Sequence, residues 1–526
     1  MQQLTGLDAA FLAMETPTVY GHVGSICILD PSTATEPFTL EHLTEVVQSR
    51  LHLLPPFRRR LVEVPFGVDQ PYWIEDPDFD IEFHVRELAL PTPGDDRQLA
   101  DQAARLHARP LDRRRPLWEL YLIHGLQGNR VAIYTKVHHA AIDGVSGNDI
   151  LTALLDLSPE GREMEEPPPW ECDKVPGNIR MVSSSVVSLA KQPLRAARLT
   201  YGIAKSLPSL AKSPARPRLP LIDDLLGRDS RVMLPSAPLR APHTPFNRSI
   251  TGHRRWAFRD IDLADVKKLK NAAGLTVNDV VMALCAGALR RWLDDHQALP
   301  NDPLVAAVPV SIRAEGEKLG NRVSSMLAPL PTNVSDPVER MRLSHQAMLA
   351  AKEQHGALPA DLLGDVTQFA APALANQAAR LAARTRLVER ISPFNLIISN
   401  VPGPNVPLYY AGAKLLAYYP LSAIADGQGL NITVMSYGGK MFFGLISDRD
   451  LVPDLDAMAG YLVDELQELL AAIAPPSGRA GAKASGSGAH GTGADAPATK
   501  GSSSTKGSSS TKTSNSRAKV SAASSA

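Results

Sequence analysis

The 526-residue sequence has few cysteines and no visible export signal. Its three cysteines, Cys27, Cys172 and Cys285, lie far apart and match neither a disulfide framework nor a zinc-ligand spacing. The N-terminus has no basic segment followed by a long apolar stretch, so we expect no secretory signal. Together these absences favour a reducing, cytoplasmic setting.

Long hydrophobic runs and an excess of one charge are also missing. The strongest apolar run, residues 280–289, is about half as long as a membrane-spanning helix requires, so we expect no such helix. The 55 basic and 55 acidic residues balance, which gives no reason to expect nucleic acid as a partner. What the chain does have is 44% hydrophobic residues, enough for substantial cores in two or three domains.

Composition separates two unusual segments from the rest of the chain. Residues 475–526 consist largely of Gly, Ala, Ser, Thr and Lys and cannot bury much apolar surface, so we expect a disordered tail. Residues 167–246 form a Pro/Ser-rich connector, which contains nine Lys or Arg and no Asp or Glu between residues 174 and 222. Within it, residues 182–212 fit either an amphipathic helix on a membrane surface or a crossover helix that covers a core.

On either side of the connector, strands and helices alternate, which predicts two α/β domains over residues 1–166 and 247–474. We expect strands at residues 25–29, 73–74, 120–124, 131–139, 304–311, 394–399, 430–437 and 441–447. We expect helices at residues 40–51, 97–107, 145–156, 263–272, 278–292 and 453–472.

Two adjacent histidines, His138 and His139, end the predicted strand at residues 131–139. Alternation along a strand points the two rings to opposite faces, so they cannot chelate one metal ion from this strand. No other cluster of His, Cys or carboxylate residues accompanies them, and we expect no metal site.

Asp143 and Gly144 follow the histidine pair. A helix cap and a tight turn would explain these two residues but not the histidines before them. A histidine with its ordinary pKa near 6.5 is suited to act as a general base. Because the sequence has no Gly-x-Ser-x-Gly elbow and no reactive-cysteine context, direct transfer of a group to an acceptor fits better than a covalent intermediate.

The segment His138-His139-Ala140-Ala141-Ile142-Asp143-Gly144 resembles the His-His-x-x-x-Asp-Gly motif of coenzyme A-dependent acyltransferases and nonribosomal condensation domains. Further segments resemble bacterial wax ester synthase/acyl-CoA:diacylglycerol acyltransferases of the actinobacterial triacylglycerol synthase type, and the resemblance covers roughly residues 4–472. These segments are residues 7–12, 15–18, 308–313 and 320–322, Pro116-Leu117-Trp118-Glu119, Asn278-Asp279, and Ser399-Asn400-Val401-Pro402-Gly403-Pro404.

The resemblance implies a two-domain, chloramphenicol-acetyltransferase-like α/β fold with an interdomain tunnel. It implies that His139 takes the proton from an acceptor hydroxyl as the oxygen attacks the thioester of a long-chain acyl-CoA, a role that contributes about 100- to 10,000-fold. His138, Asp143 and Gly144 would support the loop. The implied product is triacylglycerol made from diacylglycerol, with wax esters from long-chain alcohols as a second product. No cofactor is implied, because acyl-CoA is a substrate.

The remaining motifs also have structural explanations, so we expect them to support the site instead of carrying its chemistry. Pro116, Leu117 and Trp118 could anchor an aromatic ring in the core. Asn278 and Asp279 could cap an apolar helix. The segment containing Ser399, Asn400, Pro402 and Gly403 could form a rigid turn after a strand. For a buried Asp143 we expect Arg313 as the charge partner.

Two rival functions remain open. A condensation-type acyltransferase of lipid or polyketide assembly would share the histidine motif, but the chain has no recognisable carrier-protein segment. An inactive lipid-surface protein would not need His139. The acceptors are nearly insoluble, so we expect a cytoplasmic protein that associates peripherally with the inner membrane or lipid droplets, with the basic connector as the contact.

Overall fold

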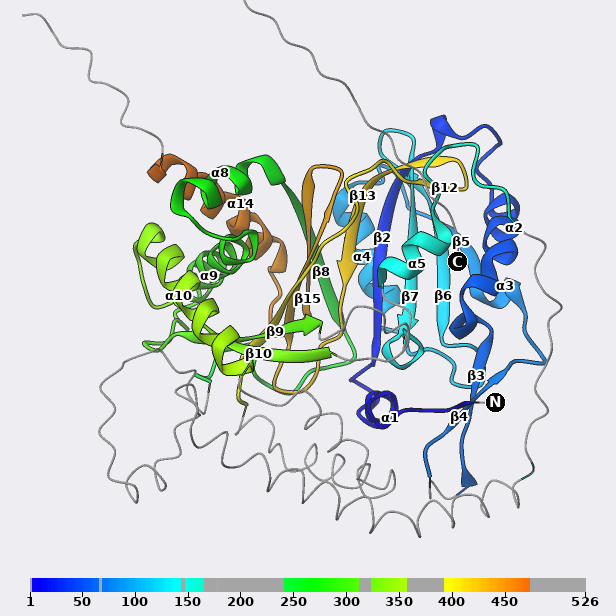
Figure 1. Cartoon of the computed structure of the whole chain (residues 1–526), viewed down its shortest axis with the longest axis horizontal. Helices are drawn as coiled ribbons and strands as arrows, with labels where there is room; N and C mark the ends of the chain where they lie inside the picture. Colours follow the sequence, from blue (N-terminus) through cyan, green and yellow to red (C-terminus); the bar gives the residue numbers. More distant parts are fainter. Residues whose placement is uncertain are drawn as a thin grey trace, which may run out of the picture. The chain divides into compact units, whose positions relative to one another are not determined.

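The computed structural model describes residues 2–65, 69–142, 147–164, 177, 241–311, 323–356 and 392–473. The predicted site residues Asp143, Gly144 and Arg313, the connector before residue 241 apart from Gly177, and the tail all lie outside this part of the chain. Contacts divide the chain into one unit over Met1–Ala474 and a second over Pro475–Ala526. The first unit contains two six-stranded sheets, which define its N-lobe and C-lobe (Figure 1).

The N-lobe sheet has the strand order β12-β13-β2-β7-β6-β5, in which only the edge pair β5 and β6 is parallel. Its strands are β2 (His22–Asp30), β5 (Val85–Ala89), β6 (Trp118–Leu126), β7 (Arg130–His138), β12 (Tyr409–Tyr410) and β13 (Ala413–Leu421). The lobe also has the helices α1 (Gly6–Ala13), α2 (Leu40–Arg50), α3 (Ile81–His84), α4 (Asp96–His107) and α5 (Gly147–Leu154). A small sheet combines β1 (Gln2–Gln3), β4 (Tyr72–Glu75) and β3 (Arg59–Val62).

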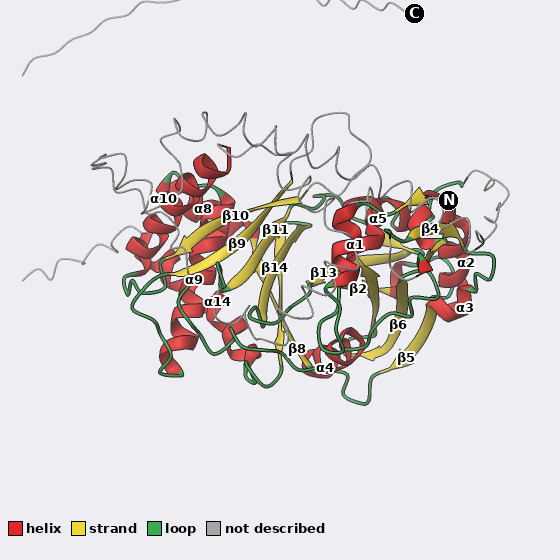
Figure 2. Ribbon diagram, turned by 90° about the horizontal axis from the view of Figure 1, so that it is seen from below, coloured by secondary structure: helices red, strands yellow, loops and turns green. Residues whose placement is uncertain are grey.

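The C-lobe sheet has the order β10-β9-β11-β14-β15-β8. Its strands are β8 (Arg254–Asp262), β9 (Leu304–Ser311), β10 (Val323–Leu330), β11 (Leu396–Val401), β14 (Leu430–Tyr437) and β15 (Lys440–Asp448). Its helices, α8 (Leu263–Ala273), α9 (Val277–Asp295), α10 (Pro337–Gly356) and α14 (Leu455–Ile473), lie on one side of this sheet (Figure 2). Helix α9 is apolar around most of its circumference because it packs between the sheet and the other helices.

Strand β13 joins the two halves of the chain. It follows the C-lobe strand β11 in sequence, yet it pairs antiparallel with β2 of the N-lobe, from Lys414 opposite Asp30 to Leu421 opposite Gly24. In Figure 1 the yellow β13 lies beside the blue β2. The sheets therefore do not follow the predicted division at residues 166 and 247, and those domain boundaries stay a prediction.

Several predicted elements are confirmed. The strands predicted at residues 304–311 and 430–437 are β9 and β14, residue for residue. The strand predicted at residues 131–139 was one residue too long, since β7 ends at His138 and His139 begins a 3-10 turn, His139–Ile142. The sequence patterns did not predict strands β1, β3, β5, β8, β10, β12 and β13 or helices α1, α3 and α10.

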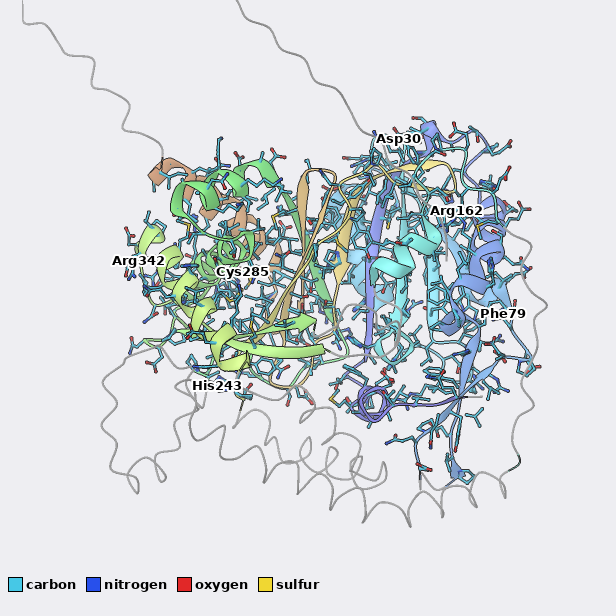
Figure 3. The ribbon with its side chains drawn as sticks, viewed as in Figure 1. Asp30, Phe79, Arg162, His243, Cys285 and Arg342 are labelled. Carbon is cyan, nitrogen blue, oxygen red and sulfur yellow. The ribbon has the colours of Figure 1, made fainter. Side chains whose placement is uncertain are left out.

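Two of the three cysteines lie within the described residues. Cys27 on β2 and Cys285 on α9 are buried free thiols, and Figure 3 shows Cys285 within the C-lobe. Burial raises the pKa of each thiol to about 12, so neither is a reactive nucleophile at neutral pH.

Within the described residues, no single helix is long and apolar enough to cross a membrane. The bent pair α8 and α9 meets the criterion of length and composition only when both helices are taken together.

Candidate active site

His138 occupies the last position of β7, where both of its ring nitrogens are used. The side chain is 1% exposed, and its Nε2 lies 3.2 Å from Oε1 of Glu15. The Ala140 N–H donates to Nδ1 of the same ring at 3.1 Å. Because Nδ1 accepts a hydrogen bond, the ring proton is on Nε2, which donates to Glu15. The bond to Ala140 also turns the chain out of the strand, which is why the predicted strand was too long.

Glu15 is a fixed anion whose role no sequence motif predicted. Its Oε1 accepts the Gly21 N–H at 2.9 Å, and its Oε2 accepts from Nη2 and Nε of Arg113 at 2.7 and 3.1 Å. Burial alone would raise the pKa of this carboxyl, but the bonds and charges of His138, Gly21 and Arg113 outweigh burial and lower the pKa to about 2. The carboxylate therefore stays charged and holds His138 in one orientation.

His139 begins the 3-10 turn and stacks on Phe11 of α1, with ring centroids 4.1 Å apart and planes 21° apart. Its backbone N–H donates to the Gly21 carbonyl at 2.8 Å. Helix α1 is held at its start by Thr5, whose hydroxyl oxygen accepts the Asp8 N–H. A capped helix thus positions the ring against which His139 rests.

The electrostatic surroundings keep His139 neutral. Burial, followed by the nearby His138, lowers the pKa of its ring to about 4, and a hydrogen bond to its own backbone opposes this shift. A backbone bond that raises the pKa is one in which the carbonyl accepts a ring N–H. The ring is therefore an uncharged imidazole at neutral pH, the form that a general base requires.

The segment Pro116-Leu117-Trp118 is a structural anchor for the strand that carries the histidines. The Trp118 indole donates to the Phe57 carbonyl at 2.8 Å and stacks on the rings of Phe57 and His84, at 4.6 and 4.5 Å. The Leu117 carbonyl accepts the backbone N–H of His138 at 2.9 Å. The expected packing role of Trp118 is confirmed, and Leu117 fixes the backbone of His138 directly.

In the C-lobe, Asn278 and Asp279 lie at the start of α9. Asp279 is the third helical residue and completes a capping box with Thr276. Its Oδ2 also lies 2.9 Å from Nδ1 of His345 on α10. The expected capping role of Asp279 is therefore confirmed, while Asn278 accepts a long hydrogen bond of 3.5 Å from the Asn400 side chain.

The segment at residues 399–404 is only partly a turn. Ser399 and Asn400 belong to β11, which ends at Val401, so the predicted turn begins with Pro402. The Gly403 N–H donates to Oγ of Ser436 at 3.2 Å, and a Cβ at Gly403 would lie 2.3 Å from the Ser436 carbonyl oxygen. Only glycine allows this close approach to β14.

Two family models match most of the chain. Residues 4–281 match the wax ester synthase/diacylglycerol acyltransferase catalytic domain, and residues 319–470 match the WS/DGAT C-terminal domain. The chain belongs to the wax ester synthase/diacylglycerol acyltransferase family. A probable diacylglycerol O-acyltransferase of Mycobacterium tuberculosis is 37% identical over 469 residues, which cover 89% of this chain and 98% of that relative.

Two further members of the WS/DGAT family are similar over most of their length. The O-acyltransferase WSD of Acinetobacter baylyi is 32% identical over 475 residues, covering 89% of this chain and 96% of that relative. The solved wax ester synthase/diacylglycerol acyltransferase from Marinobacter aquaeolei VT8 is 33% identical, covers 90% of this chain and 100% of its own, and gives a TM-score of 0.63. The predicted two-domain, chloramphenicol-acetyltransferase-like α/β fold is thereby confirmed.

The structure brings the predicted residues of this WS/DGAT member into two groups. His138, His139 and Leu117 meet at the end of β7, and Asn278 meets Asn400 in the C-lobe. Glu15 and Phe11 belong to the first group, although no sequence pattern predicted a role for them. Among the described residues, no three His, Cys, Asp or Glu side chains are grouped so that they could hold a metal ion.

Proposed function

We propose that this protein transfers a long-chain acyl group from acyl-CoA to the hydroxyl of diacylglycerol and so forms triacylglycerol. Long-chain alcohols would serve as alternative acceptors and give wax esters. The observation that carries the proposal is the neutral, buried imidazole of His139 beside a second histidine whose two nitrogens are both occupied. The names of the relatives, diacylglycerol O-acyltransferase and O-acyltransferase WSD, support the same reaction.

His139 acts as the general base in this proposal. Its Nε2 accepts the hydroxyl proton while the acceptor oxygen forms a bond to the thioester carbonyl carbon. The tetrahedral intermediate then expels coenzyme A by breaking the carbon–sulfur bond, and the imidazolium returns its proton to the thiolate. Because burial disfavours the charged ring, proton removal is favoured only as the new carbon–oxygen bond forms, and the proton is readily given back.

Other parts of the proposal concern residues and surfaces around His139. Asp143, paired with Arg313, and Gly144 would shape the loop after the 3-10 turn. Acyl-CoA and the acceptor would meet in a tunnel between the two lobes. Since the acceptors are nearly insoluble, the protein would collect them at the inner membrane or at lipid droplets, with the basic connector at residues 167–246 as the contact.

The test is an assay of the purified full chain with labelled palmitoyl-CoA, offered diacylglycerol and hexadecanol in parallel. We expect labelled triacylglycerol and wax ester from the wild type, and a loss of about 100- to 10,000-fold in kcat for His139→Ala. His124→Ala is the matched control, because His124 is a partly exposed histidine on β6 that pairs only with Glu87 among the described residues. Wild-type protein that esterifies neither acceptor would overturn the proposal, as would a folded His139→Ala variant with normal turnover.

A further inference from the structure

Two arginines on the outer part of the N-lobe share one aromatic ring. Arg86 on the edge strand β5 and Arg115 in the loop before β6 place their guanidinium carbons 4.6 and 4.2 Å from the ring centre of Phe83. Arg86 also lies over the Tyr121 ring at 5.8 Å and donates to its hydroxyl at 3.0 Å. Aromatic contacts of this kind fix the plane of a guanidinium group and leave its other N–H donors available.

A third cation, Arg109, stands in the same region. Its side chain is exposed, and its carbonyl accepts from the buried ammonium of Lys136 at 3.2 Å. Burial lowers the pKa of Lys136, the Glu119 carboxylate opposes this, and the charges of Arg109 and Arg86 lower the pKa further. The charges of Arg86 and Arg109 therefore both act on Lys136, and Arg115 shares the Phe83 ring with Arg86. We call Arg86, Arg109 and Arg115 the arginine cluster.

Carboxylates do not balance the arginine cluster. Among the residues that the structure describes, neither Arg86 nor Arg109 has a carboxylate within ion-pair distance, and Arg115 reaches Asp80 only at 4.0 Å. Glu119, whose charge acts on Tyr121 beside Arg86, is already paired with Lys136 at 2.8 Å.

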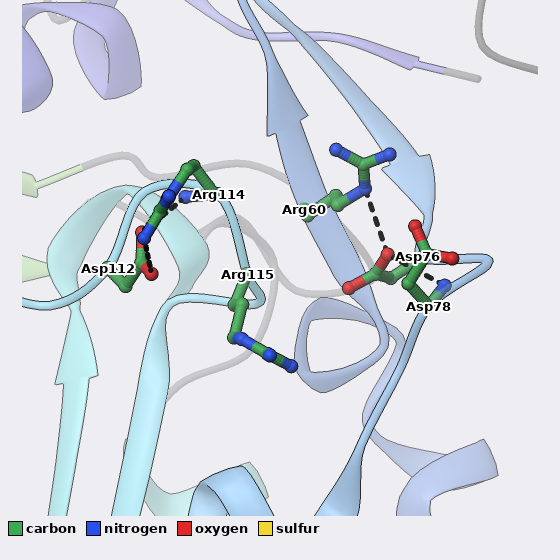
Figure 4. Close-up of a pocket in the computed structure, with 6 residues that line it drawn as sticks. All are labelled: Arg60, Asp76, Asp78, Asp112, Arg114 and Arg115. Atoms are coloured by element: carbon green, nitrogen blue, oxygen red, sulfur yellow. Dashed lines mark hydrogen bonds and ion pairs between the residues drawn. The ribbon is translucent and has the colours of Figure 1, made fainter.

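Neighbouring arginines differ in this respect, since each has a closer carboxylate. The paired arginines are Arg58, Arg59, Arg60, Arg113 and Arg114. Figure 4 shows the contrast in a pocket of about 360 Å³, where Arg60 contacts Asp76 and Arg114 contacts Asp112, whereas Arg115 has no partner among the side chains drawn. Arg115 shares this pocket with three aspartates, and its closest ion-pair contact remains Asp80 at 4.0 Å.

The cluster lies on the sheet face that carries His138. Arg86 is opposite Tyr121 in the β5–β6 register, and Tyr121 is opposite Tyr134 in the β6–β7 register. Tyr134, Lys136 and His138 alternate along β7 and so share this face. Between the cluster and His138 this face is closed, because Tyr134 and Lys136 are fully buried and contact His107 and Leu106 of helix α4.

We propose that the arginine cluster is a binding site for a phosphate group. Planar guanidinium groups bind phosphate through paired, charge-assisted hydrogen bonds, and three of them match a group with two negative charges. The phosphate could be that of acyl-CoA, a source that rests on the proposed function, or that of a membrane lipid head group. Both sources offer the same chemistry, and the experiments below separate them.

The first experiment compares two acyl donors with the triple variant Arg86→Gln/Arg109→Gln/Arg115→Gln. Palmitoyl-CoA carries phosphates, whereas palmitoyl-N-acetylcysteamine has the same thioester and none. If coenzyme A is the source, KM for palmitoyl-CoA should rise roughly 10- to 100-fold, with KM for the truncated thioester unchanged. The control is Arg97→Gln/Arg105→Gln/Arg114→Gln, which removes the same charge from exposed positions. Should the triple variant fail to fold, Arg109→Gln alone replaces it and should show a smaller rise.

The second experiment needs no turnover. Calorimetric titration with coenzyme A and flotation with phosphatidylcholine vesicles, with and without phosphatidic acid, are carried out on the same variants. Loss of coenzyme A binding identifies the donor as the source, and loss of binding to phosphatidic acid vesicles identifies a lipid. Either loss in a protein that has no acyltransferase activity would keep the site and reject the proposed function. If the cluster variant matches its control in KM, coenzyme A binding and flotation, the phosphate site is wrong.

Discussion

His138 and Glu15 are 123 residues apart in sequence, and their side chains meet at 3.2 Å. The contact fixes the orientation of the first of the two adjacent histidines. Nε2 of His138 donates to Glu15 and Nδ1 accepts the Ala140 N–H, so the ring holds the turn in place. His139 stacks on Phe11, and burial keeps its ring neutral.

Glu15→Gln should lower kcat with little change in KM. The amide has no charge to hold Arg113, and it no longer fixes the tautomer of His138, so the 3-10 turn under His139 loosens. We expect a kcat loss of tenfold or more, and a cost of about 1–3 kcal/mol in the free energy of unfolding. Steady-state kinetics and urea unfolding measure the two effects.

Glu63→Gln is the control for this substitution, because Glu63 lies 4.0 Å from the same arginine and its side chain is 74% exposed. Glu63→Gln should leave kcat and the free energy of unfolding near their wild-type values. Equal losses from the two substitutions would mean that the Arg113 ion pairs, and not the bond to His138, carry the effect.

Gly21→Ala should displace the His138 ring. A Cβ at this position would lie 2.6 Å from Nε2 of His138, too close for any relaxed packing. Overpacking of this kind costs about 1–3 kcal/mol, and here the moving group also sets the turn that holds His139. We expect kcat to fall at least tenfold, as measured with palmitoyl-CoA and diacylglycerol.

Gly460→Ala is the matched control, since a Cβ there meets nothing within 4 Å on helix α14. It should raise the free energy of unfolding slightly and leave kcat unchanged. A Gly21→Ala variant with full activity would show that the His138 ring can move without consequence.

Local patterns predicted much of the fold and the central histidines. Strands β9 and β14 are buried and apolar, so their bounds could be read from a run of hydrophobic residues. The pairing of β13 with β2 could not be predicted, because Lys414 lies opposite Asp30 through backbone hydrogen bonds, which have no sequence signature. That pairing is what makes one sheet from both halves of the chain.

The residues of the site also fall into those that sequence patterns could predict and those that they could not. Adjacent histidines and an aromatic after a proline are visible in the sequence, and they directed attention to His139 and Trp118. Their partners are not visible, because Glu15, Phe11 and Phe57 reach them only through tertiary contacts. The end of β7 was misplaced by one residue because a ring-to-backbone bond at His138, and not a propensity, terminates the strand.

Asp279→Ala tests whether Asp279 serves as a helix cap or takes part in the reaction. The substitution removes the capping box of α9 and the bond to His345, so we expect the free energy of unfolding to fall by about 0.5–2 kcal/mol. Because the contacts of Asp279 explain it as a cap, kcat per folded molecule should stay within about twofold. Asp294→Ala, at the exposed end of the same helix, is the control and should change neither quantity. A large loss of kcat in a stable Asp279→Ala protein would assign this residue to the reaction.

Activity should remain constant between pH 8 and about pH 5 and fall only at lower pH. The pKa of His139 is lowered to about 4, so the ring remains an unprotonated base throughout that range. An ordinary histidine, with a pKa near 6.5, would lose activity below neutrality. The measurement is kcat/KM against pH, restricted to pH values at which the protein stays folded. A midpoint near 6.5 would contradict the depressed value or the assignment of the base.

Stability should decline as the pH falls from about 6.5 towards 4, before most carboxylates titrate. Burial lowers the pKa of His107 to about 3 and that of His84 to about 4, as it does for His139. Since the unfolded chain protonates these rings near pH 6.5 and the folded chain does not, the unfolded state binds more protons in this window and gains stability as the pH falls. Urea midpoints at pH 7.5, 6 and 5 measure the decline. His107→Gln should make it shallower because it removes one such ring, while His124→Gln, at a partly exposed position, should not. An equally steep decline in the His107→Gln protein would show that this ring takes up no extra proton on unfolding.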